Sequence, residues 1–473
     1  MAARRIAAML GLHSNGLLTA IVAACALAFA APHLRAAESA QPATKPASTT
    51  AVPSTTPPVK KKPKPLPPKK KPAAAKKPTP KPAPPPPPPP PPPVELIGLL
   101  VMPAEAFRGG SPAGQYDGEG RRGAQPRFES QPVQGVSSIK PGPTAGAWWA
   151  LSDNGFGSRW NSPDYRLCIY LFDVRPRTIA GGDTRNALQA VIELSDPAHF
   201  FPWRIADESD PERLLTGADA DPESLVALPD GTFWVGDEFG PWLLHFSVDG
   251  ELLGPPFELP DSARSADHPA ALAKPGTAKI EHSRGFEAID LAGDNKTLVT
   301  MLEGTVAGDA PRTLRVQRFD TATSKWLPET LIYALDADTQ SVTDLSRIEG
   351  NRFVVVERDE FQGEAAKAKR VYSIDLDKAL TDKNLAEKNQ AGKPLAKKLV
   401  IDLLNIGNAR GLAESLPPGA PFRFPYLTTE SIQVLDRRRV VIVNDNNYPA
   451  TGGRGPNLAD GTEWIWLELA NPL

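Results

Sequence analysis

The sequence predicts an all-β fold, a β-propeller of about six blades, and three observations support this prediction. Residues 94–473 contain short runs rich in Val, Ile, Trp and Phe, separated by Gly, Asp, Asn and Pro, as strands and turns are. Helical periodicity is weak over the same range. A hairpin pattern recurs five times, and such recurrence is typical of blades arranged around an axis. A large β-sandwich, or two separate β-domains, is the alternative.

The first element along the chain is an export signal, predicted over residues 1–37. Arg4 and Arg5 provide the positive start, residues 16–31 are apolar and uncharged, and small residues follow at the expected cleavage region. The apolar run is short for a membrane-spanning helix. We therefore expect a cleaved signal and a periplasmic or secreted domain. A lipoprotein is the alternative, because Val22-Ala-Ala-Cys25 resembles a lipobox.

The second element is a linker over residues 38–93. It contains eleven lysines and ends in ten consecutive prolines, residues 84–93. A segment with so little apolar surface cannot form a core, and we expect an extended, disordered polyproline-type spacer in which the ten prolines span roughly 30 Å. Lysines at this density are attracted to polyanions, so the linker is predicted to contact the cell wall or an anionic membrane surface.

The remaining residues, 94–473, form the predicted propeller domain, and this domain is acidic. Of the 53 Lys and Arg and 55 Asp and Glu residues, residues 1–93 hold 14 and one, which leaves a net charge of −15 for the domain. Such a charge disfavours nucleic acid as a partner and favours a cation, although acidity also serves solubility. With Cys25 removed, Cys168 is the only cysteine, so no internal disulfide is expected. We expect a monomer.

Each of the five hairpins begins with a polar residue and has an acidic residue near the end of its second strand. The first residue of one hairpin strand and the last residue of its partner lie at the same end of the hairpin. A radial arrangement therefore brings all five pairs to one end of the propeller axis, here called the mouth. Outer strands are predicted at residues 167–174, 243–248, 314–319 and 371–374, and the strands at 95–101 and 464–469 are predicted to close the ring in one shared blade. Residues 195–220 are predicted to form a loop and residues 376–398 a short helix. The pairs are Ser138 with Asp153, Glu223 with Glu238, Glu287 with Glu303, Asp344 with Glu357, and Glu430 with Asp445.

Carboxylates crowded at one mouth repel one another, and a hard divalent cation with oxygen ligands would neutralise them. Ca²⁺ is the expected cofactor, positioning an ester or phosphate ester while a free carboxylate acts as general base. Each of these acids could instead cap a loop or pair with an arginine. The candidate catalytic residues are Glu223, Asp237, Glu238, Glu287 and Glu430. The candidate substrate-binding residues are Arg284, Arg358, Asn154, Asn444 and Asn446. The candidate metal ligands are Asp153, Glu303, Glu357, Asp359 and Asp445.

Four motifs of the predicted propeller domain are distinctive. They are Arg213-Leu-Leu-Thr-Gly-Ala-Asp-Ala-Asp-Pro-Glu-Ser-Leu, Phe233-Trp-Val-Gly-Asp-Glu-Phe-Gly-Pro, Arg284-Gly-Phe-Glu-Ala-Ile and Val443-Asn-Asp-Asn-Asn-Tyr-Pro. Together they resemble the phytase-like family, named for the esterase-like activity of phytase, whose members are exported bacterial β-propeller proteins. The resemblance covers residues 95–470. It implies a propeller, export, hydrolysis of phosphate or other esters, and site residues at Glu223, Asp237, Glu238, Glu287, Glu430, Asn444 and Asp445.

Other chemistries lack their motifs. The sequence has no G-x-S-x-G nucleophile elbow, no H-E-x-x-H zinc motif, no Cys/His cluster, no P-loop and no dinucleotide fingerprint. His199, His245, His268 and His282 are expected to be structural or exposed. Two hypotheses remain: a Ca²⁺-dependent exported ester hydrolase, and a non-catalytic propeller that serves the cell envelope as a tethered binding or scaffolding module.

Overall fold

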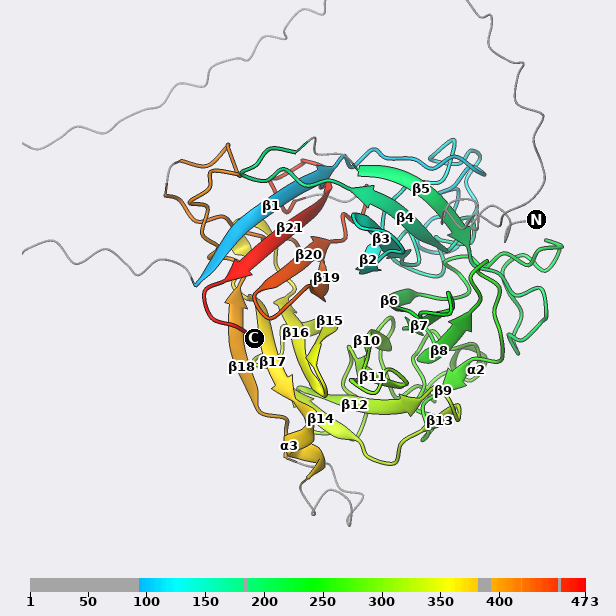
Figure 1. Ribbon diagram of the computed structural model, residues 1–473. Helices are drawn as coiled ribbons and strands as arrows, with labels where there is room; N and C mark the ends of the chain where they lie inside the picture. The colour runs from blue at the N-terminus through cyan, green and yellow to red at the C-terminus, as the bar shows by residue number, and fades with distance from the viewer. Residues whose placement is uncertain (1–92, 183–185, 382–392, 418, 450–451) are drawn as a thin grey trace, which may run out of the picture. The chain divides into compact units, whose positions relative to one another are not determined.

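The computed structural model describes residues 93–182, 186–381, 393–417, 419–449 and 452–473. In the described residues the chain forms five β-sheets arranged around a central axis, a five-bladed propeller (Figure 1). The expected export signal and nearly all of the expected linker lie outside the described residues. The all-β propeller is therefore confirmed, with five blades rather than the six that the sequence favoured.

The blades follow one another along the chain, and the first strand of each lies nearest the axis (Figure 1). The strands of the first blade are β2 (Val136–Pro141), β3 (Ala147–Ser152), β4 (Cys168–Val174) and β5 (Asn186–Glu193). Those of the second are β6 (Pro222–Ala227), β7 (Phe233–Asp237), β8 (Trp242–Phe246) and β9 (Phe257–Glu258). Those of the third are β10 (Phe286–Leu291), β11 (Thr297–Leu302), β12 (Thr313–Asp320), β13 (Lys325–Trp326) and β14 (Leu331–Ala334).

The fourth and fifth blades complete the ring. The fourth contains β15 (Gln340–Glu349), β16 (Arg352–Asp359), β17 (Lys369–Asp375) and β18 (Lys397–Asp402). The fifth contains β19 (Thr429–Val434), β20 (Arg439–Asn444), β21 (Thr462–Leu469) and β1 (Val94–Met102). Strand β1 pairs antiparallel with β21, from Val94 opposite Leu469 to Met102 opposite Thr462. The predicted closure, in which the two ends of the domain share one blade, is confirmed.

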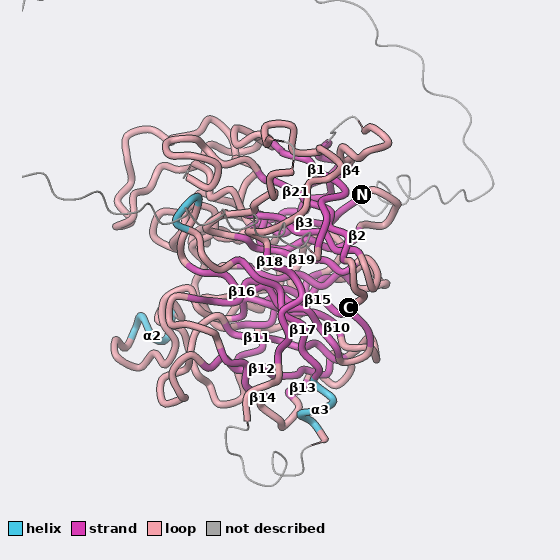
Figure 2. The backbone as a smooth tube through the Cα atoms, turned by 90° about the vertical axis from the view of Figure 1, so that its left-hand side faces the viewer, coloured by secondary structure: helices cyan, strands magenta, loops and turns pink. Residues whose placement is uncertain are grey.

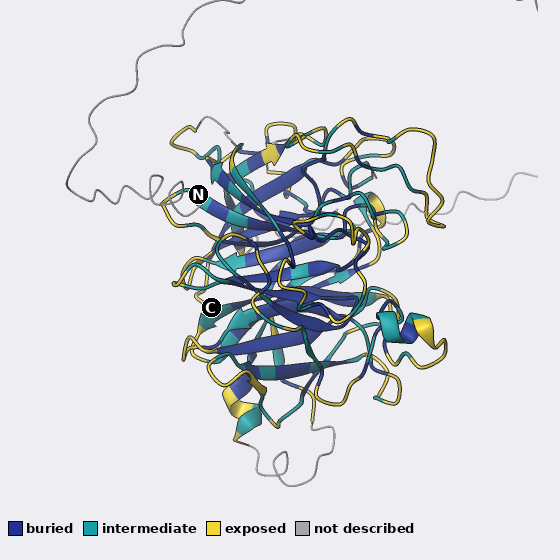
Figure 3. Cartoon of the chain, turned by 90° about the vertical axis from the view of Figure 1, so that its right-hand side faces the viewer, coloured by how far each residue is buried: buried dark blue, intermediate teal, exposed yellow. Residues whose placement is uncertain are grey.

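The core lies between the blades, because every blade is covered on both faces. Five apolar clusters occupy the five spaces between neighbouring blades. Strand β20 shows why: its side chains alternate, so that Val440 and Ile442 pack toward the fourth blade while Val441 and Val443 pack toward the first. Dark blue, buried strands therefore fill the interior in Figure 3.

Helices are few, and loops form both ends of the propeller (Figure 2). The described helices are α2 (Pro269–Ala273), the 3₁₀ turn at Gly363–Ala365 and α3 (Leu376–Leu380). Helix α3 confirms the start of the helix expected in 376–398, whereas residues 382–392 lie outside the described residues. Residues 195–220 form the predicted loop. Among the described helices, none combines the length and apolarity needed to cross a membrane.

An acidic cavity at the mouth of the propeller

The innermost strands all start at one end of the axis, and each carries a β-bulge at the same place. The register of β6 against β7 shifts between Pro222 and Ser224, so that Glu223 is the extra residue. The same shift occurs in every other blade. A bulge bends the strand and redirects the extra side chain. The five extra residues are Ser137, Glu223, Glu287, Thr343 and Glu430.

The second strand of each blade returns to the same end and supplies the matching position. In the second blade Asp237 pairs with Pro222, and Glu238 follows it directly. The corresponding residues of the other blades are Asp153, Glu303, Arg358 and Asp445. The sequence comparison of the hairpins thus finds three pairs correctly. In the first and fourth blades the predicted residues are one position off. Ser137 stands where Ser138 was predicted, Thr343 where Asp344 was predicted, and Arg358 where Glu357 was predicted.

These positions, apart from Thr343, line one cavity of about 510 Å³ at the mouth. The cavity is lined by nine carboxyl groups and two guanidinium groups. The carboxylates are Asp153, Asp221, Glu223, Glu238, Glu287, Glu303, Glu360, Glu430 and Asp445. The guanidinium groups belong to Arg284 and Arg358, and Asn154 and Asn447 add amide groups.

The carboxylates approach one another closely enough to share a cation. Among the described residues, three groups of three acids each place one oxygen per residue within 4.8 Å of the others. The groups overlap, because Glu223, Glu238 and Glu287 each belong to two of them. They are Asp221 with Glu223 and Glu238, Glu223 with Glu287 and Glu430, and Glu238 with Glu287 and Glu303.

Burial and mutual repulsion raise the pKa values of Glu223, Glu238 and Glu287. Burial is the largest cause for Glu223, Glu238 and Glu287, and the neighbouring carboxylates add to it. Burial likewise raises the pKa of Glu430 to about 8 and that of Asp445 to about 6. Removing water from a carboxylate favours its neutral form, and each neighbouring negative charge does the same. Both effects favour the protonated forms of these acids.

Two arginines offset part of this charge. Arg284 Nη1 lies 3.0 Å from Glu303 Oε2, and Arg358 Nη2 lies 3.7 Å from the other oxygen of Glu303. Arg358 also lies 3.8 Å from Glu430. Burial alone would lower the pKa of Arg358, but Glu430 and Glu303 outweigh it and hold its pKa above the usual value. Both arginines line the cavity, and the neighbouring carboxylates favour their cationic forms.

Five of the predicted site residues lie outside the cavity wall. For most of them, the alternation of side chains along a strand explains why the side chain points away from the cavity. Asp237 accepts hydrogen bonds from the backbone N–H groups of Asp221 (2.7 Å) and Gly240 (2.7 Å), so it holds the loops around the mouth. Asn444 occupies the same position in the fifth blade and bonds the backbone of Glu463 and Gly461. Successive side chains along a strand point in opposite directions. Asp237 and Asn444 therefore point away from the cavity, whereas the residues that follow them, Glu238 and Asp445, point into it.

The other three candidates outside the wall have structural partners. Glu357 accepts hydrogen bonds from Tyr333 (2.8 Å) and Lys397 (2.6 Å). Asp359 accepts hydrogen bonds from the backbone N–H groups of residues 367 and 368 and lies 3.2 Å from Lys369 Nζ. Asn446 accepts a hydrogen bond from the backbone N–H of residue 448. The remaining candidates all line the cavity.

Sequence reasoning missed the loop residues that complete the mouth. Asp221 accepts hydrogen bonds from Asn154 Nδ2 (2.7 Å) and Ser283 Oγ (2.9 Å) and belongs to one of the three acid groups. His282 also lines the cavity. Asp221 lies two residues before Glu223 in the motif that starts at Arg213, and this position could have indicated that Asp221 reaches the mouth. His282 and Ser283 lie just before the motif that starts at Arg284, and no sequence pattern separated them from ordinary loop residues.

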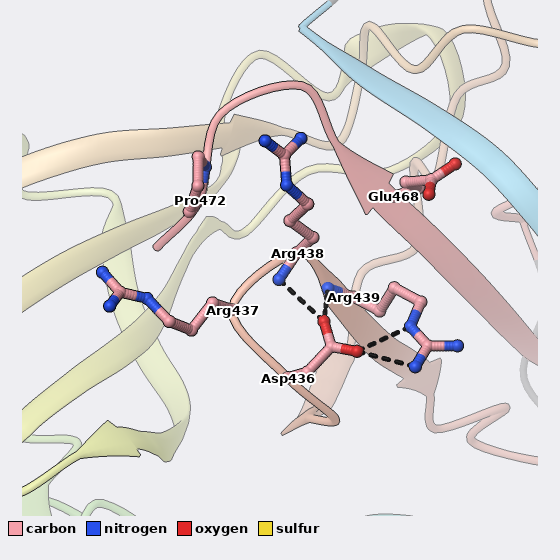
Figure 4. A pocket seen from close by; sticks show the side chains of 6 residues that line it. All are labelled: Asp436, Arg437, Arg438, Arg439, Glu468 and Pro472. Carbon is pink, nitrogen blue, oxygen red and sulfur yellow. Dashed lines mark hydrogen bonds and ion pairs between the residues drawn. The ribbon is translucent and has the colours of Figure 1, made fainter.

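Another cavity, of about 700 Å³, lies at the opposite end of the fifth blade (Figure 4). Its wall includes Arg437, Arg438 and Arg439, which precede or begin β20, whereas Asn444 ends that strand at the mouth. Asp436 accepts hydrogen bonds from the backbone N–H groups of Arg438 (2.8 Å) and Arg439 (2.9 Å) and pairs with the Arg439 side chain (Figure 4). This cavity holds none of the predicted site residues.

Comparison with known proteins identifies the family. Residues 131–448 match the phytase-like family, described as "Esterase-like activity of phytase". The chain belongs to this family. The match spans all five inner hairpins, so the acidic mouth lies within the family's shared region.

Individual relatives are distant. An uncharacterized secreted protein of Arthroderma benhamiae is 27% identical over 111 residues, which is 19% of this chain and 20% of that protein. Among solved structures, a luciferin-regenerating enzyme is 11% identical with a TM-score of 0.36, covering 79% of this chain and 94% of that one. A calcium-binding protein, regucalcin, from Agrobacterium tumefaciens is 11% identical with a TM-score of 0.35, covering 72% and 94%. An exo-β-1,3-galactanase from Phanerochaete chrysosporium is 9% identical with a TM-score of 0.37, covering 78% and 64%.

Proposed function

We propose that the chain is an exported hydrolase of phosphate or carboxylic esters that uses a divalent cation, Ca²⁺, held at the acidic mouth. Membership of the phytase-like family and the propeller fold support a hydrolase-like propeller. The substrate class, the cation and the export are part of the proposal. The observation that carries it is the convergence of acids from several blades on overlapping three-oxygen groups.

The residues fit a calcium ion in their chemistry. Ca²⁺ takes six to eight oxygen ligands, mainly carboxylates and amide or backbone carbonyls, and the mouth offers carboxylates with no thiolate or imidazole in the three groups. Glu238 adds a second observation, because the residue is 4% exposed and its Oε1 has no hydrogen-bond partner among the described residues. A buried, unpartnered carboxylate oxygen costs free energy unless a cation or proton meets it. Glu223, Glu238 and Glu287 would therefore hold the ion, with Asp221 and Glu430 beside them.

The other residues of the mouth would bind and orient the substrate. When bound, Ca²⁺ would polarise an ester oxygen and offset the negative charge that develops on it. Arg284 and Arg358 lie at the same cavity and would hold an anionic group of the substrate through charge-assisted hydrogen bonds. Each arginine has a carboxylate partner, so substrate binding would exchange one anionic partner for another.

The test is a hydrolysis assay of the purified chain with phosphate monoesters and simple carboxylic esters, in the presence of Ca²⁺ or a chelator. We expect Ca²⁺-dependent turnover that Glu287→Gln reduces. Glu364→Gln, an exposed control outside the cavity, should leave turnover unchanged. Absence of cation-dependent turnover on every ester would contradict the hydrolase. Ca²⁺ binding without turnover would favour the competing function, a non-catalytic tethered module of the cell envelope.

A further inference from the structure

The loop before β10 places an imidazole–carboxylate pair at the rim of the mouth. His282 lines the acidic cavity, and its Nδ1 lies 2.9 Å from Asp267 Oδ1. The other oxygen of Asp267 accepts the backbone N–H of Ser283 at 2.9 Å. Asp267 is 4% exposed, so both of its oxygens have fixed partners. Both carboxylate oxygens of Asp267 are thus engaged by residues of this loop.

This arrangement selects one tautomer of His282. An ionised carboxylate only accepts hydrogen bonds, so in the neutral imidazole Nδ1 carries the proton and Nε2 carries the free electron pair. The His282 side chain is 68% exposed, and Nε2 makes no hydrogen bond to any residue that the structure describes. Nε2 is thus available as a proton acceptor.

Ser283 connects this pair to the acids. Its Oγ donates a hydrogen bond to Asp221 Oδ2 at 2.9 Å, while its backbone N–H is held by Asp267. Its φ of +43° is a conformation that residues other than glycine adopt rarely, and these two hydrogen bonds hold it there. Two successive residues therefore face different partners: Ser283 faces the acid group of Asp221, and His282 stands beside it.

The proposed hydrolase needs a proton acceptor that the cation does not occupy. Carboxylates that bind the ion have their electron pairs engaged, and Arg284 and Arg358 are held in their cationic forms. His282 supplies the imidazole of the described cavity wall. We propose that His282 is the general base of the mouth and that Asp267 is its positioning residue. This inference rests on the proposed function.

The step balances without a further reactant. Nε2 of His282 takes a proton from water as the water oxygen bonds to the phosphorus or acyl carbon of the ester. The bond from that atom to the alcohol oxygen breaks, and the alcohol oxygen takes the proton back from the imidazolium. The imidazole returns to its neutral form, and the products are the acid and the alcohol. Such proton transfer contributes typically 10²- to 10⁴-fold in rate.

Variants of His282 test its role as general base separately from the rest of the mouth. His282→Asn keeps a donor for Asp267 where Nδ1 stood but removes Nε2, and we expect kcat to fall by about 10² to 10⁴ with little change in KM. His199→Asn is the matched control, because His199 is exposed and lies outside the cavity wall. Added imidazole should restore part of the activity of His282→Ala, which a merely structural role would not allow.

Asp267→Asn tests the positioning role. Asn has one acceptor, which Ser283 N–H requires, so its amide group would face His282 and donate to Nδ1. The other tautomer then forms, and Nε2 loses its electron pair. Nitrogen NMR of the imidazoles reads this change without any activity: we expect the Nδ1–H form of His282 in the wild type and the Nε2–H form in Asp267→Asn. Wild-type spectra with His282 in the Nε2–H form would overturn the assignment.

The outcomes distinguish this inference from the function on which it rests. No turnover by the wild type overturns both. Ca²⁺-dependent wild-type turnover that survives in His282→Asn, or that imidazole fails to restore in His282→Ala, overturns the histidine alone. Calorimetric Ca²⁺ binding should be the same in the wild type and His282→Asn. A loss of that binding would show that His282 supports the cation site, and it too would overturn the role of base.

Discussion

Glu430→Gln should stabilise the protein without added cation, and the gain should grow with pH. Burial raises the pKa of Glu430 from 4.5 to about 8, so the folded state retains a proton that the unfolded chain releases. Stability carried by such a group is present near pH 4.5 and is lost as pH rises toward 8, at roughly 1.4 kcal/mol per pH unit for one proton. Gln cannot ionise, so it avoids this loss.

The magnitude follows from the two pKa values. Between pH 5 and pH 8 the wild type should lose roughly 3 kcal/mol through Glu430 alone, and Glu430→Gln should recover this amount. The assay is urea unfolding in chelator at both pH values, with Glu364→Gln as control, because the Glu364 side chain is 98% exposed and pairs with Arg423. A surface pair of this kind contributes about 0–1 kcal/mol. A Glu430→Gln gain that is equal at pH 5 and pH 8 would refute the reasoning.

Three further predictions follow from the same structure. Ca²⁺ should raise the melting temperature more at pH 8 than at pH 5, because protons and the cation compete for the same carboxylates. Equal shifts of the melting temperature at both pH values in a thermal scan would contradict this competition. Lys369→Met should cost about 3–5 kcal/mol of unfolding free energy, because it leaves the buried Asp359 without its cation, yet calorimetry should find Ca²⁺ binding unchanged. Deleting residues 41–92 should leave the melting temperature unchanged, whereas extending the deletion through Met102 should lower it, because β1 is then missing from the fifth blade. Equal melting temperatures for the two deletion variants would count against closure of the ring by β1.

The fold could be predicted because hairpins reveal themselves in local sequence. Each blade contributes an apolar strand, a turn and a second apolar strand, and the alternation of β20 shows that both faces are buried. The blade count was harder, because a blade without a clear motif was counted beside the five hairpins. The insertion at 195–220 was predicted as a loop and adds no blade. In the structure this insertion joins the rims of the first two blades, where Ser195 bridges to Leu214 and Glu251.

The site could be predicted to within one residue per strand. Period-two alternation identifies which strand ends reach the mouth, but a β-bulge adds a residue that the alternation does not show. In the fourth blade the bulge lies on β15, whereas on β16 the position that faces the acids is Arg358 rather than its neighbour Glu357, which pairs with Lys397. The charge of that position therefore changes sign relative to the prediction.

Loop residues could not be placed from the sequence, because their positions depend on contacts between distant segments. Asp221 meets Asn154 across 67 residues, and Ser283 reaches Asp221 across 62 residues. No local pattern encodes these distances. The pair of His282 and Asp267 depends in the same way on a loop whose path is set by the packing of the second and third blades.

Calorimetric titration of Ca²⁺ into the purified chain at pH 8, compared with Glu287→Gln, tests the cation site most directly. Glu287 belongs to two of the three overlapping acid groups. The acidic mouth predicts saturable Ca²⁺ binding with proton release by the wild type and much weaker binding by Glu287→Gln. No binding at millimolar Ca²⁺, or binding that Glu287→Gln leaves unchanged, would contradict a cation site at the mouth of the propeller.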